Sequence, residues 1–290
     1  MKQVCLSFDI EDWFQVENLR EVFPPETWDK AELRVERNTR QILDILDEKN
    51  IKATFFVLGW IAERVPGLVK EIVSRGHEVA SHGYNHQLNY NLDSDALRKD
   101  LENSKKLLED ITGIEVMGYR APTFSISDEV MTMLKELGYK YDSSLNDFPL
   151  HDRYGKLSGE KSVGPFLHSS GIVEIPMPLV SIFNKRIPIS GGGYFRLLPF
   201  GVFRNLVIRF LKENNLYVFY MHPWEIDDEQ PRVKDIKLTN TVRQYTALAK
   251  TERRLRTLVD EIKKRNNARF ERLGQLLTSS VKQEETGGAQ

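Results

Sequence analysis

Residues 1–14 read MKQVCLSFDIEDWF, an apolar run of strand-like composition that ends in three closely spaced carboxylates. Residues 4–9 predict a buried β-strand, and six similar runs follow along the chain, separated by longer helical periodicities. These further predicted strands cover residues 53–58, 77–81, 115–119, 139–142, 172–175 and 216–221. Because strands that alternate with helices form parallel sheets, the pattern favours one seven-stranded (β/α) barrel over two separate domains.

The composition excludes several classes of protein. Of the 290 residues, 40% are hydrophobic and 29% are charged, so the chain can bury a core and is not disordered. A formal net charge of −1 argues against a nucleic-acid-binding protein. No apolar run approaches the roughly 18 residues of a membrane span. The single cysteine, Cys5, leaves no internal disulfide, and the first residues carry no export-signal pattern.

Three segments interrupt the repeating pattern. Residues 143–171 are rich in Ser, Gly, Pro and His and predict a long loop. Three consecutive glycines within residues 181–199 predict a close approach of the backbone to another part of the molecule. An apolar stripe over residues 239–277 predicts one long C-terminal helix. The predicted division of the chain is a barrel over 1–230, a helical extension over 231–277 and a flexible tail over 278–290.

Asp9, Glu11 and Asp12 follow the first predicted strand directly. Three carboxylates in four residues repel one another unless a cation or a proton relieves them. In extended backbone Asp9 and Glu11 share a face, whereas Asp12 points away unless the chain turns. The group therefore predicts either a cation site or a turn and helix cap before Trp13.

His82 and His86 in SHGYNH follow the third predicted strand, four residues apart. On a helical turn this spacing brings both imidazoles to one side, which suits a divalent metal such as zinc. A structural pair of histidines is the alternative interpretation. His77 lies inside the predicted strand, and we expect it to be structural.

Arg120, Asp142 and His222 each end a predicted strand. The carboxyl ends of parallel strands meet at one edge of the sheet, where β/α folds build their sites. An arginine there can keep a carboxylate ionised, and a histidine can act as a general acid, although each residue can equally be structural. Together with the metal candidates, these residues predict metal-assisted hydrolysis of an amide.

At these residues the sequence resembles the polysaccharide deacetylases of carbohydrate esterase family four, which share the NodB-homology domain. Five family motifs have counterparts in the family's order, within roughly residues 1–230. The resemblance implies a distorted (β/α) barrel and a divalent metal, with zinc as the first choice. Asp9 matches the catalytic base and Arg120, in RAP, the arginine that orients it. His82 and His86 match the metal-binding pair.

The resemblance also implies roles at the later strand ends. Asp142 in YDSSL matches the fourth motif, and His222 in MHP matches the general acid of the fifth. The backbone N–H of Thr123, after the proline of RAP, is implied to stabilise the oxyanion.

The first motif departs from the family pattern. Most members have two adjacent aspartates, the base and then a metal ligand, but here Ile10 follows Asp9. Some members space the two by one further residue, which makes Glu11 the preferred ligand and leaves Asp12 open.

A narrower resemblance joins the chain to the subgroup found with exosortase and exopolysaccharide gene clusters. It is carried by SFDIEDWFQ, GGGYFRLLP and HPWEIDDEQPR, and it implies a subgroup-specific region starting near residue 180. Trp13, Tyr194 and Trp224 in these segments are suitable for stacking on sugar rings, and a core-packing role for each is the alternative.

The implied function is a metal-dependent hydrolase that removes acetyl groups from N-acetylated sugars of a polysaccharide or its lipid-linked precursor. Two alternatives stay open: a small-amide or ureide hydrolase of the allantoinase-like type, and a non-catalytic sugar-binding relative. The expected partners are an N-acetylated glycan and a membrane-bound polysaccharide assembly complex, and no nucleic acid. The expected location is the cytoplasm, at the inner membrane face.

Overall fold

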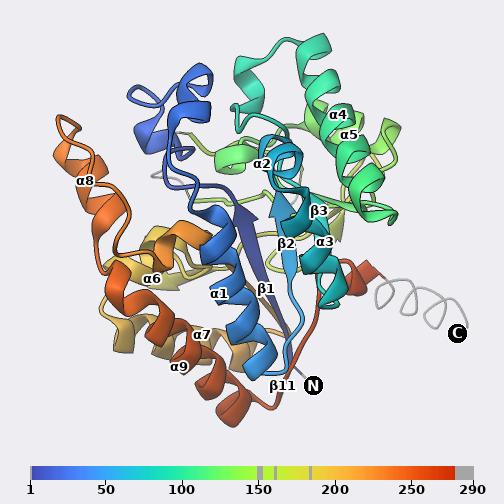
Figure 1. The fold of residues 1–290 in the computed structure, drawn as a ribbon. Coiled ribbons are helices and arrows are strands. Elements are labelled where there is room, and N and C mark those ends of the chain that lie inside the picture. Colours follow the sequence, from blue (N-terminus) through green and yellow to red (C-terminus); the bar gives the residue numbers. More distant parts are fainter. Residues whose placement is uncertain (1, 149–152, 160–161, 183–184, 278–290) are drawn as a thin grey trace, which may run out of the picture.

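The computed structural model describes residues 2–148, 153–159, 162–182 and 185–277. Within them, one curled sheet has the strand order β10-β1-β2-β3-β4-β5-β7-β6, and β11 pairs with the start of β1 (Figure 1). Its strands are β1 (Lys2–Ile10), β2 (Thr54–Val57), β3 (Glu78–Ser81), β4 (Gly118–Tyr119), β5 (Tyr141–Asp142), β6 (Phe166–Leu167), β7 (Val173–Glu174), β10 (Leu216–Met221) and β11 (Ala268–Phe270).

The seven predicted strands correspond to seven parallel strands of this sheet, from β10 through β1 to β7. The last of them pairs with the first, with Gln3 opposite Leu216, as in a barrel. In the described residues the ring of hydrogen bonds is open between β7 and β10, and the short strand β6 pairs antiparallel at the β7 edge. The predicted α/β barrel class is therefore confirmed, as a curled half-barrel.

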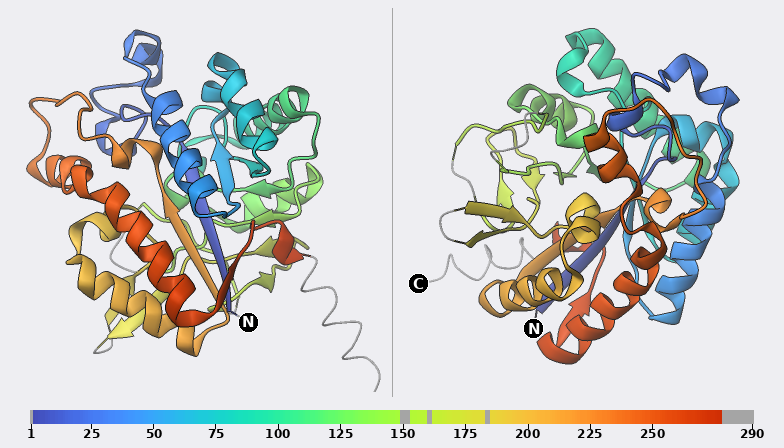
Figure 2. Two further views of the ribbon diagram at one scale, coloured as in Figure 1. Left: turned by 60° about the horizontal axis from the view of Figure 1, so that its bottom comes forward. Right: turned by 90° about the vertical axis from the view of Figure 1, so that its left-hand side faces the viewer.

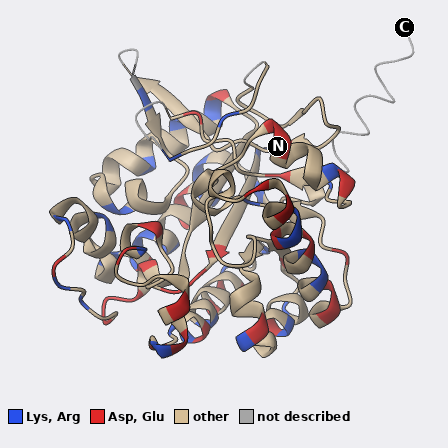
Figure 3. Cartoon of the chain, turned by 90° about the horizontal axis from the view of Figure 1, so that it is seen from above, with Lys and Arg blue, Asp and Glu red and all other residues tan. Residues whose placement is uncertain are grey.

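Helices cover the outer face of the curled sheet, as the two views of Figure 2 show. Positions of acidic and basic residues are interspersed on these helices, as the red and blue segments of the ribbon in Figure 3 show. No described helix is both long and apolar enough to cross a bilayer. The helices are α1 (Val35–Glu48), α2 (Gly59–Arg64), α3 (Pro66–Ser74), α4 (Ser94–Thr112), α5 (Asp128–Glu136), α6 (Gly192–Leu197), α7 (Phe200–Glu213), α8 (Leu238–Tyr245) and α9 (Leu248–Asn266).

Alternation along β1 divides its side chains between two apolar clusters. Leu6 and Phe8 belong to the large cluster that includes the buried faces of the helices. Cys5 belongs to a smaller cluster with Phe56 of β2 and Val218 of β10. Ser7 and Asp9 share the face of Cys5, so the strand directs the aspartate into the curl of the sheet, above this smaller cluster.

The C-terminal region differs from the single long helix that the apolar stripe predicts. The helix is broken between α8 and α9, where Ala247 has φ +59°, and it ends at Asn266. The carbonyl oxygens of Arg243, Gln244 and Thr246 accept hydrogen bonds from the Arg196 guanidinium, and these contacts compete with a continuous helix. Phe270, predicted on the helical stripe, instead lies in β11. The predicted tail over residues 278–290 lies outside the described residues.

The predicted loop over residues 143–171 has, in its described part, only the short strand β6 as regular structure. The segment predicted around the three glycines contains a two-stranded hairpin of β8 (Leu179–Ile182) and β9 (Lys185–Pro188), followed by the glycines and α6. Gly191 forms an isolated parallel bridge with Tyr220 of β10, so the predicted close approach of the backbone is confirmed.

Replacing Gly191 by alanine is expected to destabilise the protein by about 3 kcal/mol or more, because both its conformation and its surroundings exclude a side chain. Its φ is +131°, and an added Cβ would lie 1.9 Å from the carbonyl oxygen of Tyr220. Gly113→Ala is the matched control, since φ there is +68° but no described atom lies within 4 Å of the added Cβ. That change should cost about 1–2 kcal/mol. Urea unfolding measures both, and equal losses would contradict the argument.

Candidate active site

The pocket at the carboxyl ends of the strands has a volume of about 280 Å³. Asp9 and Glu11 line it from the end of β1, His82 and His86 from the loop after β3, and His222 from the end of β10. Side chains from sequence segments far apart thus converge where β/α folds carry their sites. Of the strand-end residues that the sequence groups together, these five line the pocket, and Arg120 and Asp142 do not.

Asp9, in the wall of this pocket, forms a buried ion pair with Arg120, which lies behind the lining residues. Nη1 of Arg120 donates to Oδ1 of Asp9 at 2.7 Å, and both side chains are at most 3% exposed. The same nitrogen also donates to the hydroxyl of Ser7, and the rest of the guanidinium donates to the backbone carbonyl and hydroxyl oxygens of Ser143. The arginine is thereby fixed in place against the Asp9 carboxylate.

Glu11, His82 and His86 offer three ligand atoms that lie within 4.8 Å of one another, and all three residues are buried. The spacing of the two histidines predicts a helical turn, and the structure shows that this prediction is wrong. They stand on a loop in which Gly83 and His86 have φ of +73° and +50°. Because this loop folds back, the ring centroids of His82 and His86 still lie 5.3 Å apart.

The protonation of His82 and Glu11 suits a cation. Burial lowers the pKa of His82 to about 4, so its imidazole is neutral at pH 7. Nδ1 of His82 lies 2.8 Å from the carbonyl oxygen of Arg120, which can only accept, so Nδ1 carries the proton and Nε2 is free to ligate. Burial alone would raise the pKa of Glu11, but His86, His222 and His82 outweigh it and lower that pKa to about 2.

Unpartnered atoms test whether a divalent metal fits this group. Oε2 of Glu11 lies 2.9 Å from Nε2 of His86, yet the two atoms do not have hydrogen-bond geometry. Among the described residues, Oε2 of Glu11 has no hydrogen-bond partner although it is buried. Such atoms are costly in a protein interior unless something else binds them. A carboxylate and two imidazoles form a donor set that zinc accepts in catalytic sites, so the residues fit such a metal.

His222 stands beside the carboxylates of this group. Its Nε2 lies 3.3 Å from Oε1 of Glu11 and 3.9 Å from Oδ2 of Asp9. Its Nδ1 lies 2.8 Å from Oε1 of Glu225. Burial by itself would lower the pKa of His222, but Glu11, Glu225 and Asp9 outweigh it and raise that pKa to about 9.

Asp12 lies outside this group. The backbone N–H of Glu11 donates to the carbonyl oxygen of Asp9, so the chain turns directly after β1. Asp12 then faces α1, where its Oδ2 accepts from the N–H groups of Arg34 and Val35 at 2.6 and 2.8 Å. The structure does not bring Asp12 to the histidines, and it makes this residue an anchor for the start of α1.

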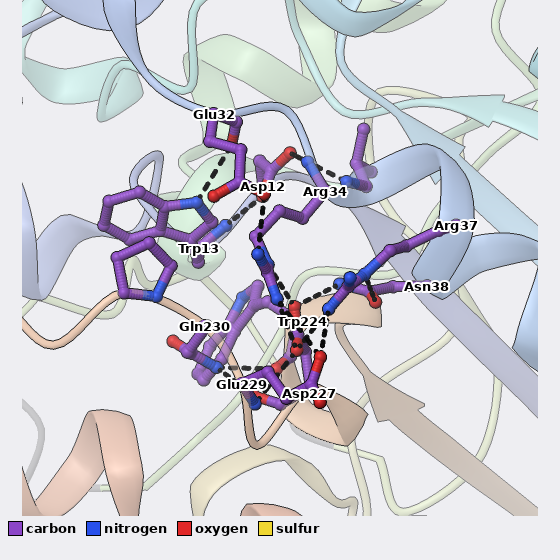
Figure 4. A network of polar contacts seen from close by, with 12 residues as sticks. Asp12, Trp13, Glu32, Arg34, Arg37, Asn38, Trp224, Asp227, Glu229 and Gln230 are labelled. Atoms are coloured by element: carbon purple, nitrogen blue, oxygen red, sulfur yellow. Dashed lines mark hydrogen bonds and ion pairs between the residues drawn. The ribbon is translucent and has the colours of Figure 1, made fainter.

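The segment after His222 is fixed to the same region by a polar network (Figure 4). Asp227 accepts from the guanidinium groups of Arg34 and Arg37 and from the amide of Asn38. Trp224 belongs to this segment, and its indole N–H donates to Oε1 of Glu11 at 3.3 Å. The network therefore joins the loops after β1 and β10 through the start of α1.

Asp142 is not among the residues that line the pocket. Its carboxylate accepts from the backbone N–H and the hydroxyl of Ser144, and the Ser144 hydroxyl accepts from the N–H of Ala121. Burial raises the pKa of Asp142. Asp142 thus supports the segment that carries Arg120, without a contact to the reacting groups.

The remaining predicted site residues fall into two groups. Thr123, Tyr194 and Trp224 line the pocket, and Thr123 has the left-handed φ of +51°, a conformation that clusters at functional sites. Trp13 does not line it. The Trp13 ring packs edge-on against Phe23 in the core and its N–H donates to the carbonyl oxygen of Glu32, so the structure gives it the alternative, core-packing role.

Three partners in the site were missed from the sequence. Ser7 shares the face of Asp9 on β1, a placement that strand alternation could have indicated. Glu225 stands three residues after His222, a spacing typical of a capping box, and this signal could have found it. Arg196, which is buried and bonded to Glu225, gives no signal in the sequence beyond its proximity to the glycines.

A buried carboxylate paired with an arginine, a group of one glutamate and two histidines that could hold a metal, and a histidine beside them form a set of side chains suited to hydrolysis on a β/α barrel. Comparison with known families agrees with this chemistry. Residues 26–141 match the family described as polysaccharide deacetylase, and residues 143–278 match a domain of unknown function, DUF3473. Residues 26–141 therefore belong to the polysaccharide deacetylase family.

One relative and two solved structures show how far the similarity extends. The chain is 36% identical over 102 residues to a peptidoglycan-N-acetylglucosamine deacetylase of Bacillus cereus, which covers 35% of this chain and 47% of that protein. The chain thus spans less than half the length of this curated relative. A Mycobacterium smegmatis protein assigned to the polysaccharide deacetylases superposes with a TM-score of 0.66 and 22% identity. The match covers 97% of this chain and 91% of that protein. A CE4 family pseudoenzyme from Bacillus anthracis superposes with a TM-score of 0.55 and 18% identity, and the match covers 96% of this chain and 66% of the pseudoenzyme. The two structures confirm the fold alone.

Proposed function

We propose that this protein is a metal-dependent deacetylase that hydrolyses the acetamido group of N-acetylated sugars in a polysaccharide or its lipid-linked precursor. The observation that carries the proposal is the convergence of the Asp9–Arg120 ion pair, the Glu11–His82–His86 group and His222 in one pocket. The curated relative, named for its action on N-acetylglucosamine of peptidoglycan, supports the substrate class.

Glu11, His82 and His86 would hold the metal, with zinc as the first choice. A bound divalent cation supplies Lewis acidity, which polarises the acetyl carbonyl and lowers the pKa of water. The buried carboxylate of Asp9, held in place by Arg120, takes the proton of the attacking water.

His222 and Thr123 act on the leaving amine and on the oxyanion. His222 protonates the leaving amine nitrogen through Nε2, because its Nδ1 is engaged by Glu225. The backbone N–H of Thr123, at the pocket wall, is suited to stabilise the oxyanion. Tyr194 and Trp224 line the same pocket and offer faces for a sugar ring.

Acetate release from tri-N-acetylchitotriose tests the proposal directly. The protein is stripped with a chelator, reloaded with zinc or cobalt, and assayed beside allantoin and simple acetamides. Metal-dependent acetate release from the glycan supports the proposal. Cleavage of the small amides alone would point to the allantoinase-like alternative, and stoichiometric glycan binding without acetate release would point to a sugar-binding relative.

Two further parts of the proposal concern the setting of the reaction. On the segments SFDIEDWFQ, GGGYFRLLP and HPWEIDDEQPR we place the chain in the exosortase and exopolysaccharide-associated subgroup. We further propose that it works beside a membrane-bound assembly complex at the cytoplasmic face of the inner membrane. Co-purification with membranes from the native cell, lost on removal of that complex, tests this setting.

A further inference from the structure

The carboxylate of Glu225 connects the candidate acid His222 to the C-terminal part of the chain. Its Oε1 accepts from Nδ1 of His222 at 2.8 Å and from the backbone N–H of the same residue at 2.9 Å. Its Oε2 accepts from Nε of Arg196 at 2.5 Å. The side chains of Glu225 and Arg196 are 0% and 2% exposed, so this is a buried contact and not a surface ion pair.

Arg196 is itself fixed by the broken end of α8. Its Nη atoms donate to the carbonyl oxygens of Arg243, Gln244 and Thr246, at 2.6, 3.3 and 2.9 Å. Its guanidinium lies 5.1 Å from the centre of the Trp224 ring, and that ring stacks on the His222 imidazole with centroids 5.4 Å apart. The His222 imidazole is therefore held at its Nδ1 edge by Glu225 and on its face by the Trp224 ring.

Capping of the short helix at Pro223–Ile226 does not explain this arrangement fully. In a capping box the Glu225 carboxylate needs to accept only from the backbone N–H of His222. The additional bond to Nδ1 fixes the imidazole ring, and a carboxylate can only accept, so Nδ1 carries its proton. Nε2 then faces Asp9 and Glu11, where the reacting group would lie.

We propose that Glu225, held by Arg196, is the positioning residue that orients His222 for protonation of the leaving amine. The inference rests on the proposed deacetylase function. In the reaction the water oxygen bonds to the acetyl carbon and the water proton passes to Asp9. The carbon–nitrogen bond then breaks with its electron pair on nitrogen, which takes the proton from Nε2 of His222. Arg196 and the carbonyl oxygens at the end of α8 thus contribute to the reaction through Glu225 and His222.

Comparing an amide substrate with an activated ester distinguishes a positioning role of Glu225 from a purely structural role. Glutamine at position 225 has one acceptor oxygen and cannot serve both His222 and Arg196. For Glu225→Gln we expect kcat on tri-N-acetylchitotriose to fall about 100-fold, with KM changed less than about threefold. On 4-methylumbelliferyl acetate, whose phenolate leaves without protonation, we expect the loss to stay below about threefold.

The activated ester reports a folded, loaded site in the same variant, so a failure to fold is recognised. Glu229→Gln is the matched control, because it makes the same chemical change at an exposed position of the same segment. Equal losses on amide and ester in Glu225→Gln, or no loss on the amide, would overturn the inference. Arg196→Lys, which keeps the charge but not the planar fork, should show the same substrate dependence with a smaller loss.

A double-mutant cycle and a spectroscopic readout complete the test. If Glu225 acts through His222, adding Glu225→Gln to His222→Gln should lower the amide rate no further. A downfield Nδ1–H resonance of His222, present in the metal-free protein and absent in Glu225→Gln, checks the contact without any activity. If the wild type deacetylates no glycan but this resonance is seen, the proposed function fails while the contact stands. If the glycan is deacetylated and the cycle is additive, the inference alone fails.

Discussion

Asp9→Asn is expected to lower kcat for acetate release from an N-acetylated glycan by at least about 10³-fold, because an amide cannot take the proton of the attacking water. Asp9 is nearly fully buried, and the pocket wall formed by the described residues offers no second carboxylate that is paired with Arg120. Asparagine keeps the shape of the side chain and one acceptor for the Arg120 guanidinium. The metal content should be unchanged, since Glu11, His82 and His86 remain.

The loss in Asp9→Asn has to be separated from a loss of stability, because the change leaves the charge of Arg120 buried without its ion-pair partner. Thermal unfolding and metal content, measured on the same preparation, make that separation. Asp228→Asn, the same change at an exposed position, serves as the control. Activity above about one tenth of the wild type in a folded Asp9→Asn protein would exclude Asp9 as the base.

The second large effect is expected at Glu11 and not at Asp12. Glu11→Gln should weaken divalent-metal binding by more than about 100-fold, since it removes the one anionic donor of the His–Glu–His group. Asp12→Asn should bind metal as the wild type does, because that carboxylate is engaged by the N–H groups of Arg34, Val35 and Trp13. Its cost should be about 1–2 kcal/mol of unfolding free energy, as for a lost helix cap.

Calorimetric titration of the stripped proteins with zinc, together with urea unfolding, distinguishes the two carboxylates. The pair is matched, because adjacent buried acids are each changed to their amide. If Asp12→Asn lost the metal and Glu11→Gln kept it, the assignment of the ligand would be reversed. Equal metal binding by both variants would argue against any role of this segment in holding a cation.

Much of the fold and of the site follows from local sequence pattern. Strand alternation places Ser7, Asp9 and Glu11 on one face, and the turn after β1 directs Asp12 elsewhere. The carboxyl ends of parallel strands meet by topology alone, so Asp9, His82, Arg120 and His222 could be grouped before their contacts were known.

Other features depend on tertiary partners that the sequence does not display. Trp13 is an aromatic residue of the kind that stacks on sugar rings. In the structure its ring packs against Phe23 and its N–H donates to a backbone carbonyl oxygen. The apolar stripe over residues 239–277 is helical in period, yet Arg196 takes up backbone carbonyls near its start, and its last part pairs with β1. For Asp142 the competing partner is Ser144, a neighbour two residues away.

The position of β1 has a consequence for the order in which the molecule can be built. Gln3 pairs with Leu216 and Val4 with Phe270, so β1 leaves the ribosome long before β10 and β11, the two strands that pair with it here. Until β10 emerges, the strand that carries Asp9 keeps an unsatisfied edge, and His222 does not yet exist. Pairings of such long sequence separation slow folding and expose strand edges to aggregation. The nascent chain therefore passes through a long catalytically incompetent stage, in which we expect it to depend on chaperones.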